Sequence, residues 1–420
     1  MWMISGRLYR EESAVSEPIV VNVMDPSFKA DPFPTYARLR EEAPVHRTTL
    51  PDGRGLWLVT RHDDVVAVLK DERFIKNWRN ALTPEQRAIH PMKESPFGAE
   101  MLSLDGPDHA RLRALIHKAF TGPFVERLRG RIQAIADQLI DAAAARGHMD
   151  LMEDYAFPLP LLVIAEMLGA PAADRDQIRD WSSAMVSIGN KTREQMLELR
   201  GKMEAFVRYV QALCDARRNA PGDDLISGLV QAEEQGEKLT QSELVAMVAL
   251  LLVAGHETTV NLLGNGMLAL FEHPDELAKL QRDPSLIKAA VEEMLRYNGP
   301  LETSTSRFAR EDLEFCGAHI PRGELVMVVL TSANRDRLRF EAPDQLDITR
   351  EDNRHVAFGY GAHYCVGAPL ARMEGQIGVT TLLRRLPDIR LAVPLREIQW
   401  RPGLLMRSAR QIPVVFSARP

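Results

Sequence analysis

Apolar residues recur at spacings of three and four along most of this chain, which is the pattern of helices that bury one face. We therefore predict a fold that is mainly α with minor β. The clearest helical stretches are residues 34–42, 62–70, 107–120, 124–146, 161–168, 193–217, 241–272, 274–283 and 286–297.

Short stretches with the character of strands lie near both ends of the chain. Residues 45–50 and 56–60 flank the turn Pro51-Asp52-Gly53-Arg54, which predicts a β-hairpin. Further strands are expected at 325–330 and 412–416. Because no linker, repeat or low-complexity run divides the sequence, we expect one domain over residues 1–420.

The stretch 241–272 is the longest and most apolar predicted helix, so we expect it to cross the centre of the protein. Its middle contains the polar residues His256, Glu257 and Thr258, and polar groups inside a core need a partner or a function. His256 and Glu257 begin like the HExxH zinc motif, but Val260 stands where the second histidine belongs. The zinc interpretation therefore fails.

The composition favours a globular protein that acts on small molecules. Apolar residues make up 45% and charged residues 26%, which is enough to bury a large core and an apolar cofactor. The net charge of −6 comes without a basic tract, so we expect no nucleic-acid partner. The protein is expected to act as a monomer.

The three cysteines are widely spaced and form no CxxC pair, which is typical of a reducing compartment. The first seventeen residues lack the apolar run of a signal peptide. The longest apolar run, 244–254, is shorter than the roughly 20 residues that span a membrane. We therefore predict a cytoplasmic protein without a membrane anchor.

The segment FGYGAHYCVG, residues 358–367, places three glycines around Cys365 directly before a predicted helix start at Ala368-Pro369. Glycine allows the backbone to approach a flat ligand closely, and a helix N-terminus favours thiolate over thiol. On composition alone, a buried free cysteine in a tight turn is the ordinary alternative.

This segment resembles the haem-binding loop of the cytochromes P-450. The resemblance implies that Cys365 is the fifth ligand of the iron of haem b, with Phe358 and Gly367 also at the cofactor. It further implies that the haem lies between the long central helix and the cysteine loop. Nearly the whole chain takes part, from 31–33 to 412–414, although Arg337 and Leu346 depart from the family's usual residues.

The segment AGHETT, residues 254–259, resembles the acid–alcohol pair of the same family. The resemblance places Ala254 against the haem and makes Glu257 and Thr258 catalytic, with the hydroxyl holding a water near dioxygen and the carboxylate relaying protons. Gly255 is expected to leave room for oxygen. The alternative for Thr258 is a hydrogen bond to the carbonyl of Ala254.

Glu293 and Arg296 lie three residues apart, a spacing that is ordinarily an exposed pair. The resemblance implies instead a buried ion network with Arg350 that supports the cysteine loop. It also implies that cations and hydrogen-bond donors bind the two haem propionates. The expected donors, each of which could otherwise be a solvated surface base, are His109, Arg113, Arg307, His355 and His363.

The resulting hypothesis is a monooxygenase that inserts one atom of dioxygen into an apolar small molecule. Because the sequence contains no dinucleotide-binding motif, the electrons are expected from a separate ferredoxin or flavodoxin with its NAD(P)H-dependent reductase. We expect this donor to bind a basic patch formed by Arg111, Lys118 and Arg372.

Three alternatives remain at this stage: a peroxide-driven or isomerising haem-thiolate enzyme, a haem gas sensor, and an all-α scaffold. The Glu257-Thr258 pair argues against the first, and Cys365 in its glycine-rich loop argues against the last. The substrate is open. The resemblance suggests a pocket lined by 75–102, 185–192, 251–254, 301–303 and 405–406. Glu302 could bind a cationic group there, but we favour a solvent-facing carboxylate.

Overall fold

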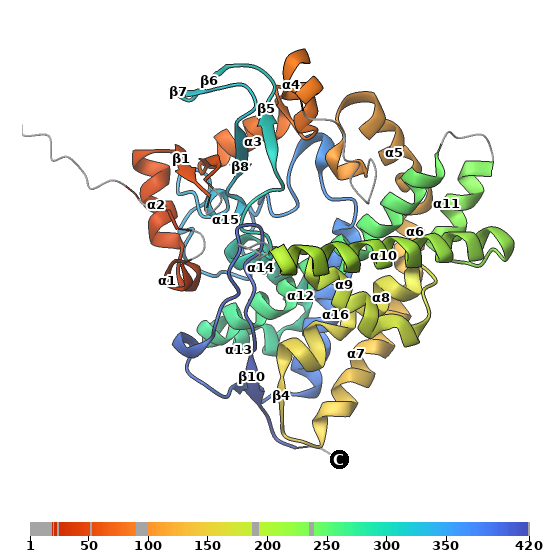
Figure 1. Ribbon diagram of the computed structural model, residues 1–420. Coiled ribbons are helices and arrows are strands. Elements are labelled where there is room, and N and C mark those ends of the chain that lie inside the picture. The colour runs from red at the N-terminus through yellow and green to blue at the C-terminus, as the bar shows by residue number, and fades with distance from the viewer. Residues whose placement is uncertain are drawn as a thin grey trace, which may run out of the picture.

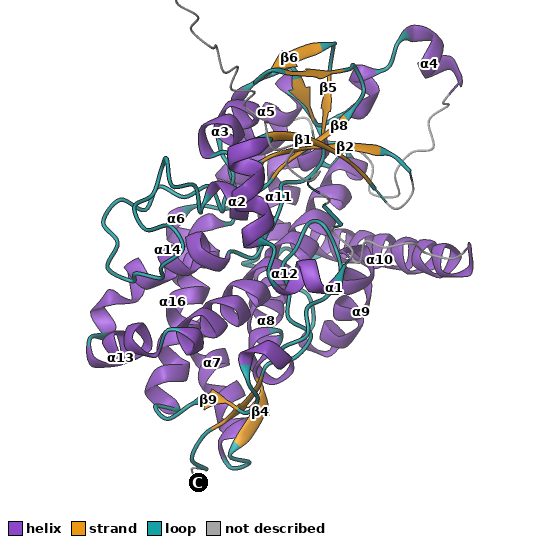
Figure 2. Cartoon of the chain, turned by 90° about the vertical axis from the view of Figure 1, so that its left-hand side faces the viewer, coloured by secondary structure: helices purple, strands orange, loops and turns teal. Residues whose placement is uncertain are grey.

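The computed structural model describes residues 19, 21–22, 25–50, 53–89, 100–186, 193–234 and 239–418. Helices dominate the described chain and small sheets lie at its periphery, which confirms the predicted class (Figures 1 and 2). The helices are α1 (Pro26–Ala30), α2 (Phe33–Glu42), α3 (His62–Lys70), α4 (Pro84–Ile89), α5 (Gly106–Ala119), α6 (Gly122–Arg127), α7 (Arg129–Ala144), α8 (Pro158–Met167), α9 (Arg175–Val186), α10 (Arg193–Asn219), α11 (Leu225–Glu234), α12 (Gln241–Glu272), α13 (Pro274–Arg282), α14 (Ile287–Asn298), α15 (Leu330–Ala333) and α16 (Ala368–Arg385).

Helix α12 runs through the centre with the predicted bounds. Thr240 and Glu243 form a capping box at its start, in which each side chain accepts a hydrogen bond from the other residue's backbone N–H. The helix packs against α8, α10, α14 and α16. By length and composition α12 would pass for a membrane span, but 61% of its most apolar window is buried inside the protein. It is therefore the core helix of this fold.

Helix α16 approaches α12 closely because two of its residues have no side chain. A Cβ at Gly378 would lie 2.8 Å from Leu263 of α12, and one at Gly375 would lie 3.1 Å from Leu262. Since the cysteine loop leads directly into α16, this close packing sets the position of the loop relative to α12.

The predicted hairpin is confirmed, with β1 (Val45–Thr49) antiparallel to β2 (Gly55–Val59). The predicted strand 325–330 ends earlier, at Val328, because Leu330 begins α15. In the turn, Pro51 and Asp52 lie outside the described residues. In the described chain, one sheet has the order β1-β2-β8-β5-β3, a second has the order β4-β10-β9, and β6 pairs with β7. The further strands are β3 (Phe74–Ile75), β4 (His148–Asp150), β5 (Arg307–Ala309), β6 (Leu313–Phe315), β7 (Ala318–Ile320), β8 (Leu325–Val328), β9 (Arg390–Leu391) and β10 (Pro413–Val415).

The helix predicted over 124–146 is wrong in one respect, because two helices occupy this stretch. Thr121 caps α6, and at Leu128 the backbone N–H bonds to the carbonyl of Val125 three residues back. This bond spans three residues where an α-helix spans four, so it interrupts the α-helical hydrogen-bond pattern between α6 and α7. Helices α1, α4, α9, α11 and α15 were not predicted, and only the start of α16 was.

Candidate functional site

The loop that carries Cys365 is a compact turn between Val356 and α16. Cys365 donates its backbone N–H to the carbonyl of Phe358 at 2.9 Å. Gly359 and Gly361 have φ of 73° and 72°, which favours glycine. A Cβ at Gly361 would also lie 2.9 Å from the carbonyl oxygen of Leu69 at the end of α3. The glycine at 361 therefore serves the contact with α3.

The Cys365 thiol experiences opposing influences. Burial raises its pKa, whereas the backbone N–H groups of Gly367 and Ala368 donate to the sulfur and lower the pKa. The guanidinium groups of Arg113 and Arg372 act in the same direction as those N–H groups. The side chain is exposed although protein atoms surround it, as is that of Ala254 on α12. Both side chains are therefore accessible to a ligand.

Basic side chains from three separate segments converge near Cys365. His109 and Arg113 come from α5, Arg307 from β5 and His363 from the cysteine loop. The rings of His109 and His363 are 4.0 Å apart between centroids. Arg113 donates to the carbonyl of Tyr364 at 2.7 Å, and Arg307 donates to that of Phe74 at 3.0 Å.

Lys76, which the sequence analysis missed, belongs to the same group. It follows strand β3 directly, is buried, and donates to the Thr305 hydroxyl and to the carbonyl of Ser306, the latter at 2.9 Å. A lysine immediately after the apolar pair Phe74-Ile75 was the available signal. Sequence reasoning could not use it, since the approach of β5 beside β3 is a tertiary contact.

The basic group carries excess positive charge. Burial and then the charge of Arg307 lower the pKa of Lys76 to about 7, and burial lowers the pKa of Arg307 to about 10. Burial, followed by the neighbouring basic groups, lowers the pKa of His363 to about 2. Among the described residues, Lys76, Arg113 and Arg307 form no ion pair, and His109 Nε2 and Arg307 Nε are buried without a hydrogen-bond partner. These residues fit a bound group with two carboxylates, such as haem.

His355 directly precedes the cysteine loop, and its ring centroid lies 6.1 Å from that of Phe358. Its Nε2 is 3.1 Å from Glu292 Oε2 and its Nδ1 accepts from the backbone N–H of Ala357. Both ring nitrogens thus have protein partners. Glu292 also binds Arg372, and the pKa of its carboxyl falls to about 2 because the hydrogen bonds from Arg372 and His355 outweigh burial.

The middle of α12 carries Glu257 and Thr258. The Thr258 hydroxyl donates to the carbonyl of Ala254 at 2.9 Å, which is the ordinary interaction of a threonine inside a helix. His256 is fully buried, and its Nε2 is 3.8 Å from Glu257 Oε1. The role expected for Gly255 is wrong, because a Cβ there would meet Ile164 of α8 at 2.8 Å. Gly255 makes room for α8.

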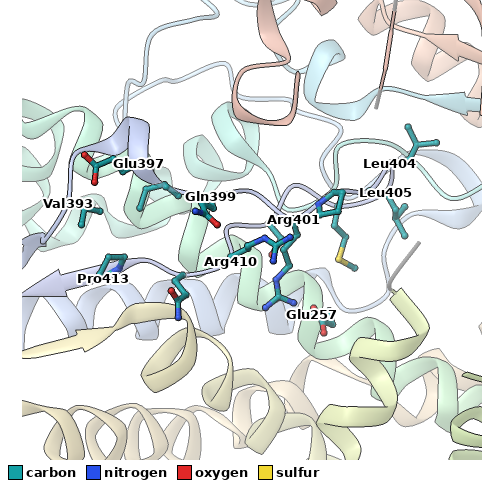
Figure 3. Close-up of a pocket in the computed structure, with 15 residues that line it drawn as sticks. Glu257, Val393, Glu397, Gln399, Arg401, Leu404, Leu405, Arg410 and Pro413 are labelled. Carbon is teal, nitrogen blue, oxygen red and sulfur yellow. The ribbon is translucent and has the colours of Figure 1, made fainter. Parts of the chain in front are cut away.

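Glu257 borders a cavity of about 790 Å³ between α12 and the C-terminal segment 393–413. Figure 3 shows Arg401 and Arg410 projecting into this cavity from the C-terminal segment, on the same side as Glu257. The lining includes Glu257 but neither Thr258 nor Cys365, so the carboxylate is the member of the acid–alcohol pair that borders the cavity. A carboxylate in such a place can exchange protons with water.

The structure brings Glu293, Arg296 and Arg350 together. Arg296 donates to Glu293 through Nε at 2.8 Å and Nη2 at 2.7 Å, and Arg350 Nε lies 3.2 Å from Glu293 Oε2. Glu293 also accepts from the backbone N–H of Asp347 and the side chain of Asn353. The remaining guanidinium N–H groups of Arg296 bind the carbonyls of Asn334, Pro343 and Gln345.

We expect Glu293→Gln to destabilise the protein by about 3–5 kcal/mol, because Arg296 would remain buried without its counter-charge. Urea unfolding followed by circular dichroism measures the change. Glu42→Gln is the matched control, since Glu42 pairs with Arg38 on the exposed face of α2, where loss of a pair costs about 1 kcal/mol or less. Equal effects of the two substitutions would contradict a buried network.

Two expectations about surface charge are corrected. Glu302 is fully buried, where it binds Lys29 and Tyr36, so it is no solvent-facing carboxylate. In the expected basic patch, Arg111 pairs with Glu243 and Arg372 pairs with Glu292. Glu243 and Glu292 therefore offset the positive charge of two of the three residues in the expected basic patch.

The stretches expected to line the substrate pocket are described in part. Leu301 forms a β-bridge with Met406, so the segments 301–303 and 405–406 do lie side by side. Residues 90–99 and 187–192 lie outside the described residues.

Three comparisons identify relatives of this chain. The family model described as Cytochrome P450 matches residues 149–389. The cytochrome P450 monooxygenase PikC of Streptomyces venezuelae is 45% identical over 97% of both chains. The polyketide biosynthesis cytochrome P450 PksS of Bacillus subtilis is also 45% identical, over 93% of this chain and 97% of its own. The myxobacterial cytochrome P450 CYP267B1, crystallised with myristic acid, has a TM-score of 0.89 and 48% identity over 94% of this chain and 98% of its own.

Proposed function

This chain belongs to the cytochrome P450 family and is a monooxygenase, and we propose that it holds haem b through Cys365. The observation that carries this assignment is the group of basic side chains beside the cysteine loop, which contains Lys76, Arg113 and Arg307 without an ion pair among the described residues. Asp105 offsets only part of its charge, since the pKa values of Lys76 and Arg307 stay lowered beside it. Arg113, Arg307, His109 and His363, together with Lys76, bind the propionates. Phe358, Gly367 and Ala254 border the porphyrin, and His355 orients Glu292.

When bound, haem supplies the redox chemistry that reduces dioxygen and transfers one of its atoms to the substrate. Thr258 would donate a hydrogen bond from α12 to a water or to dioxygen in the site, for which its hydroxyl would rotate away from the carbonyl of Ala254. Glu257 passes protons from water in the 790 Å³ cavity to the region of Thr258. A peroxide-driven or isomerising enzyme has no need of this acid–alcohol pair.

The substrate is an apolar small molecule of the size of a polyketide or fatty acid. Support comes from the relatives, since PksS is named for polyketide biosynthesis and CYP267B1 was crystallised with myristic acid. A separate ferredoxin or flavodoxin with its NAD(P)H-dependent reductase delivers the electrons. The enzyme works as a single-domain monomer in the cytoplasm.

Lys76→Met is expected to weaken haem retention about tenfold, because the propionates lose a buried cation. Transfer of haem to an excess of apomyoglobin measures the rate of loss. Lys70→Met is the control, because Lys70 is exposed and rests over the ring of Tyr360. Equal rates for the two variants would remove Lys76 from the cofactor site.

Lys76→Met should weaken the binding of haem, but it should stabilise the haem-free protein against unfolding. Burial lowers the pKa of Lys76 in the folded protein to about 7, whereas the ordinary pKa of an exposed lysine is 10.5. Between these two pH values the unfolded chain therefore binds more protons than the folded protein. Stability of the haem-free protein therefore rises with pH across this window. The variant should be the more stable protein at pH 7 and lose this advantage as the pH approaches 10, as thermal unfolding would reveal.

A further inference from the structure

A buried ion pair joins the N-terminal helix α1 to the segment that follows α14. Lys29 and Glu302 are both fully buried and bind each other through Nζ and Oε2. The Tyr36 hydroxyl donates to the other carboxylate oxygen of Glu302 at 2.5 Å. The two charged residues are 273 positions apart in the sequence, so the pair ties distant parts of the chain together.

The same residues hold the turn Leu404–Leu405–Met406. The backbone N–H of Glu302 donates to the carbonyl of Leu405 at 2.9 Å, and Lys29 Nζ donates to that of Met406 at 3.3 Å. The Thr303 hydroxyl donates to the carbonyl of Leu404 at 3.0 Å. Each carbonyl of this turn is therefore fixed by the ion pair or by its immediate neighbour.

Arg407 anchors the other end of the turn to α1. Its Nη1 and Nη2 donate to the carbonyls of Lys29 and Ala30, the latter at 3.0 Å, and its Nε donates to Asn298 Oδ1 at 3.0 Å. The guanidinium also lies 3.8 Å over the Trp400 ring. The turn consequently cannot shift without moving α1.

The turn touches the part of α12 that carries the acid–alcohol pair. Asn261 donates to the carbonyl of Glu257 at 2.9 Å, and the same Nδ2 lies 3.6 Å from Met406 Sδ. Leu405 and Met406 are only half-buried and line the cavity that Glu257 borders. Figure 3 shows Leu405 at this cavity. The side chains of both residues are thus available to a substrate beside the catalytic helix.

We propose that the Lys29–Glu302 ion pair is a specificity-determining device that fixes the position of Leu405 and Met406 in the cavity that Glu257 borders. This inference rests on the proposed function, because it takes the space between the turn and α12 as part of the substrate site. A buried ion pair adds little stability over apolar residues of the same volume, and its best-attested use is to select one arrangement of the chain. Here the selected arrangement is the register of the turn against α12.

The experiment compares two ligands that coordinate haem iron through an azole nitrogen, imidazole and clotrimazole, by difference spectroscopy. Imidazole is too small to touch the turn, whereas the triphenylmethyl group of clotrimazole fills the substrate space. In Glu302→Gln and in Lys29→Met, the Kd of clotrimazole should rise about tenfold while that of imidazole stays within about twofold. The double variant should match the single variants, because residues that act through each other are not additive.

Glu42→Gln, on the exposed face of α2, is the matched control and should leave both constants unchanged. If Glu302→Gln does not retain haem, Tyr36→Phe decides the question, since it removes only the hydroxyl that donates to Glu302. A threefold rise in the clotrimazole-to-imidazole ratio of Kd values is then expected. The proposal would be overturned if the ratio of the clotrimazole Kd to the imidazole Kd stayed constant in the variants. It would also be overturned if the increases caused by Glu302→Gln and Lys29→Met multiplied in the double variant.

These outcomes are separable from failure of the proposed function. If the unmodified protein gives no imidazole difference spectrum, the haem assignment is wrong. If imidazole binds normally and the variants leave the ratio unchanged, the cofactor assignment stands and the role of the ion pair falls.

Discussion

Replacing Cys365 by serine is expected to abolish the strongly red-shifted Soret band that the reduced protein gives with carbon monoxide. Only a thiolate ligand produces this shift, and Cys365 is the cysteine that lies beside the basic group proposed for the propionates. The loop should still fold, because the Cys365 backbone N–H still donates to the carbonyl of Phe358. A serine hydroxyl can also accept the hydrogen bonds that the backbone N–H groups of Gly367 and Ala368 donate to the sulfur. The shifted Soret band should therefore disappear while the protein remains folded.

The other two cysteines provide the controls. Cys214 is buried in the apolar core, and Cys316 lies on an exposed turn 3.2 Å from Asp64. Cys214→Ser and Cys316→Ser should both leave the shifted band in place. Its disappearance in either of them, with retention in Cys365→Ser, would show that the ligand has been misassigned.

Thr258→Ala should separate oxygen consumption from product formation. Without the hydroxyl, Thr258 would no longer direct the protons delivered along α12, so reducing equivalents would emerge as hydrogen peroxide and not as product. Coupling of NAD(P)H oxidation to product should fall by about tenfold or more, while total oxygen uptake falls much less. An oxygen electrode combined with a peroxide assay measures both quantities.

The comparison needs a substrate that is tightly coupled in the unmodified enzyme and two further variants. Thr259→Ala, at the next position on the buried side of α12, should keep its coupling. Glu257→Gln should slow total turnover through poorer proton delivery and enlarge the solvent isotope effect. Full coupling in Thr258→Ala would mean that Thr258 only bonds to the carbonyl of Ala254.

The sequence predicted those features that depend on neighbours in the chain. The period of the apolar residues located α12 at its observed bounds, and alternating residues around a turn located the β1–β2 hairpin. The helix predicted over 124–146 failed because the interruption at Leu128 leaves the apolar period intact. Periodicity cannot detect a change in the hydrogen bonding of a single residue.

The sequence by itself determined the chemistry at hand: a cysteine before a helix start, an acid next to an alcohol in the longest helix, and the spacing of Glu293 and Arg296. Only the tertiary structure decided which side chains lose contact with water and which meet. It buried Glu302 against Lys29, placed Lys76 among the basic residues near Cys365, and gave the space at Gly255 to Ile164. The reason is physical, because burial and the pairing of charges depend on segments that are distant in the sequence, and a local pattern carries no record of them.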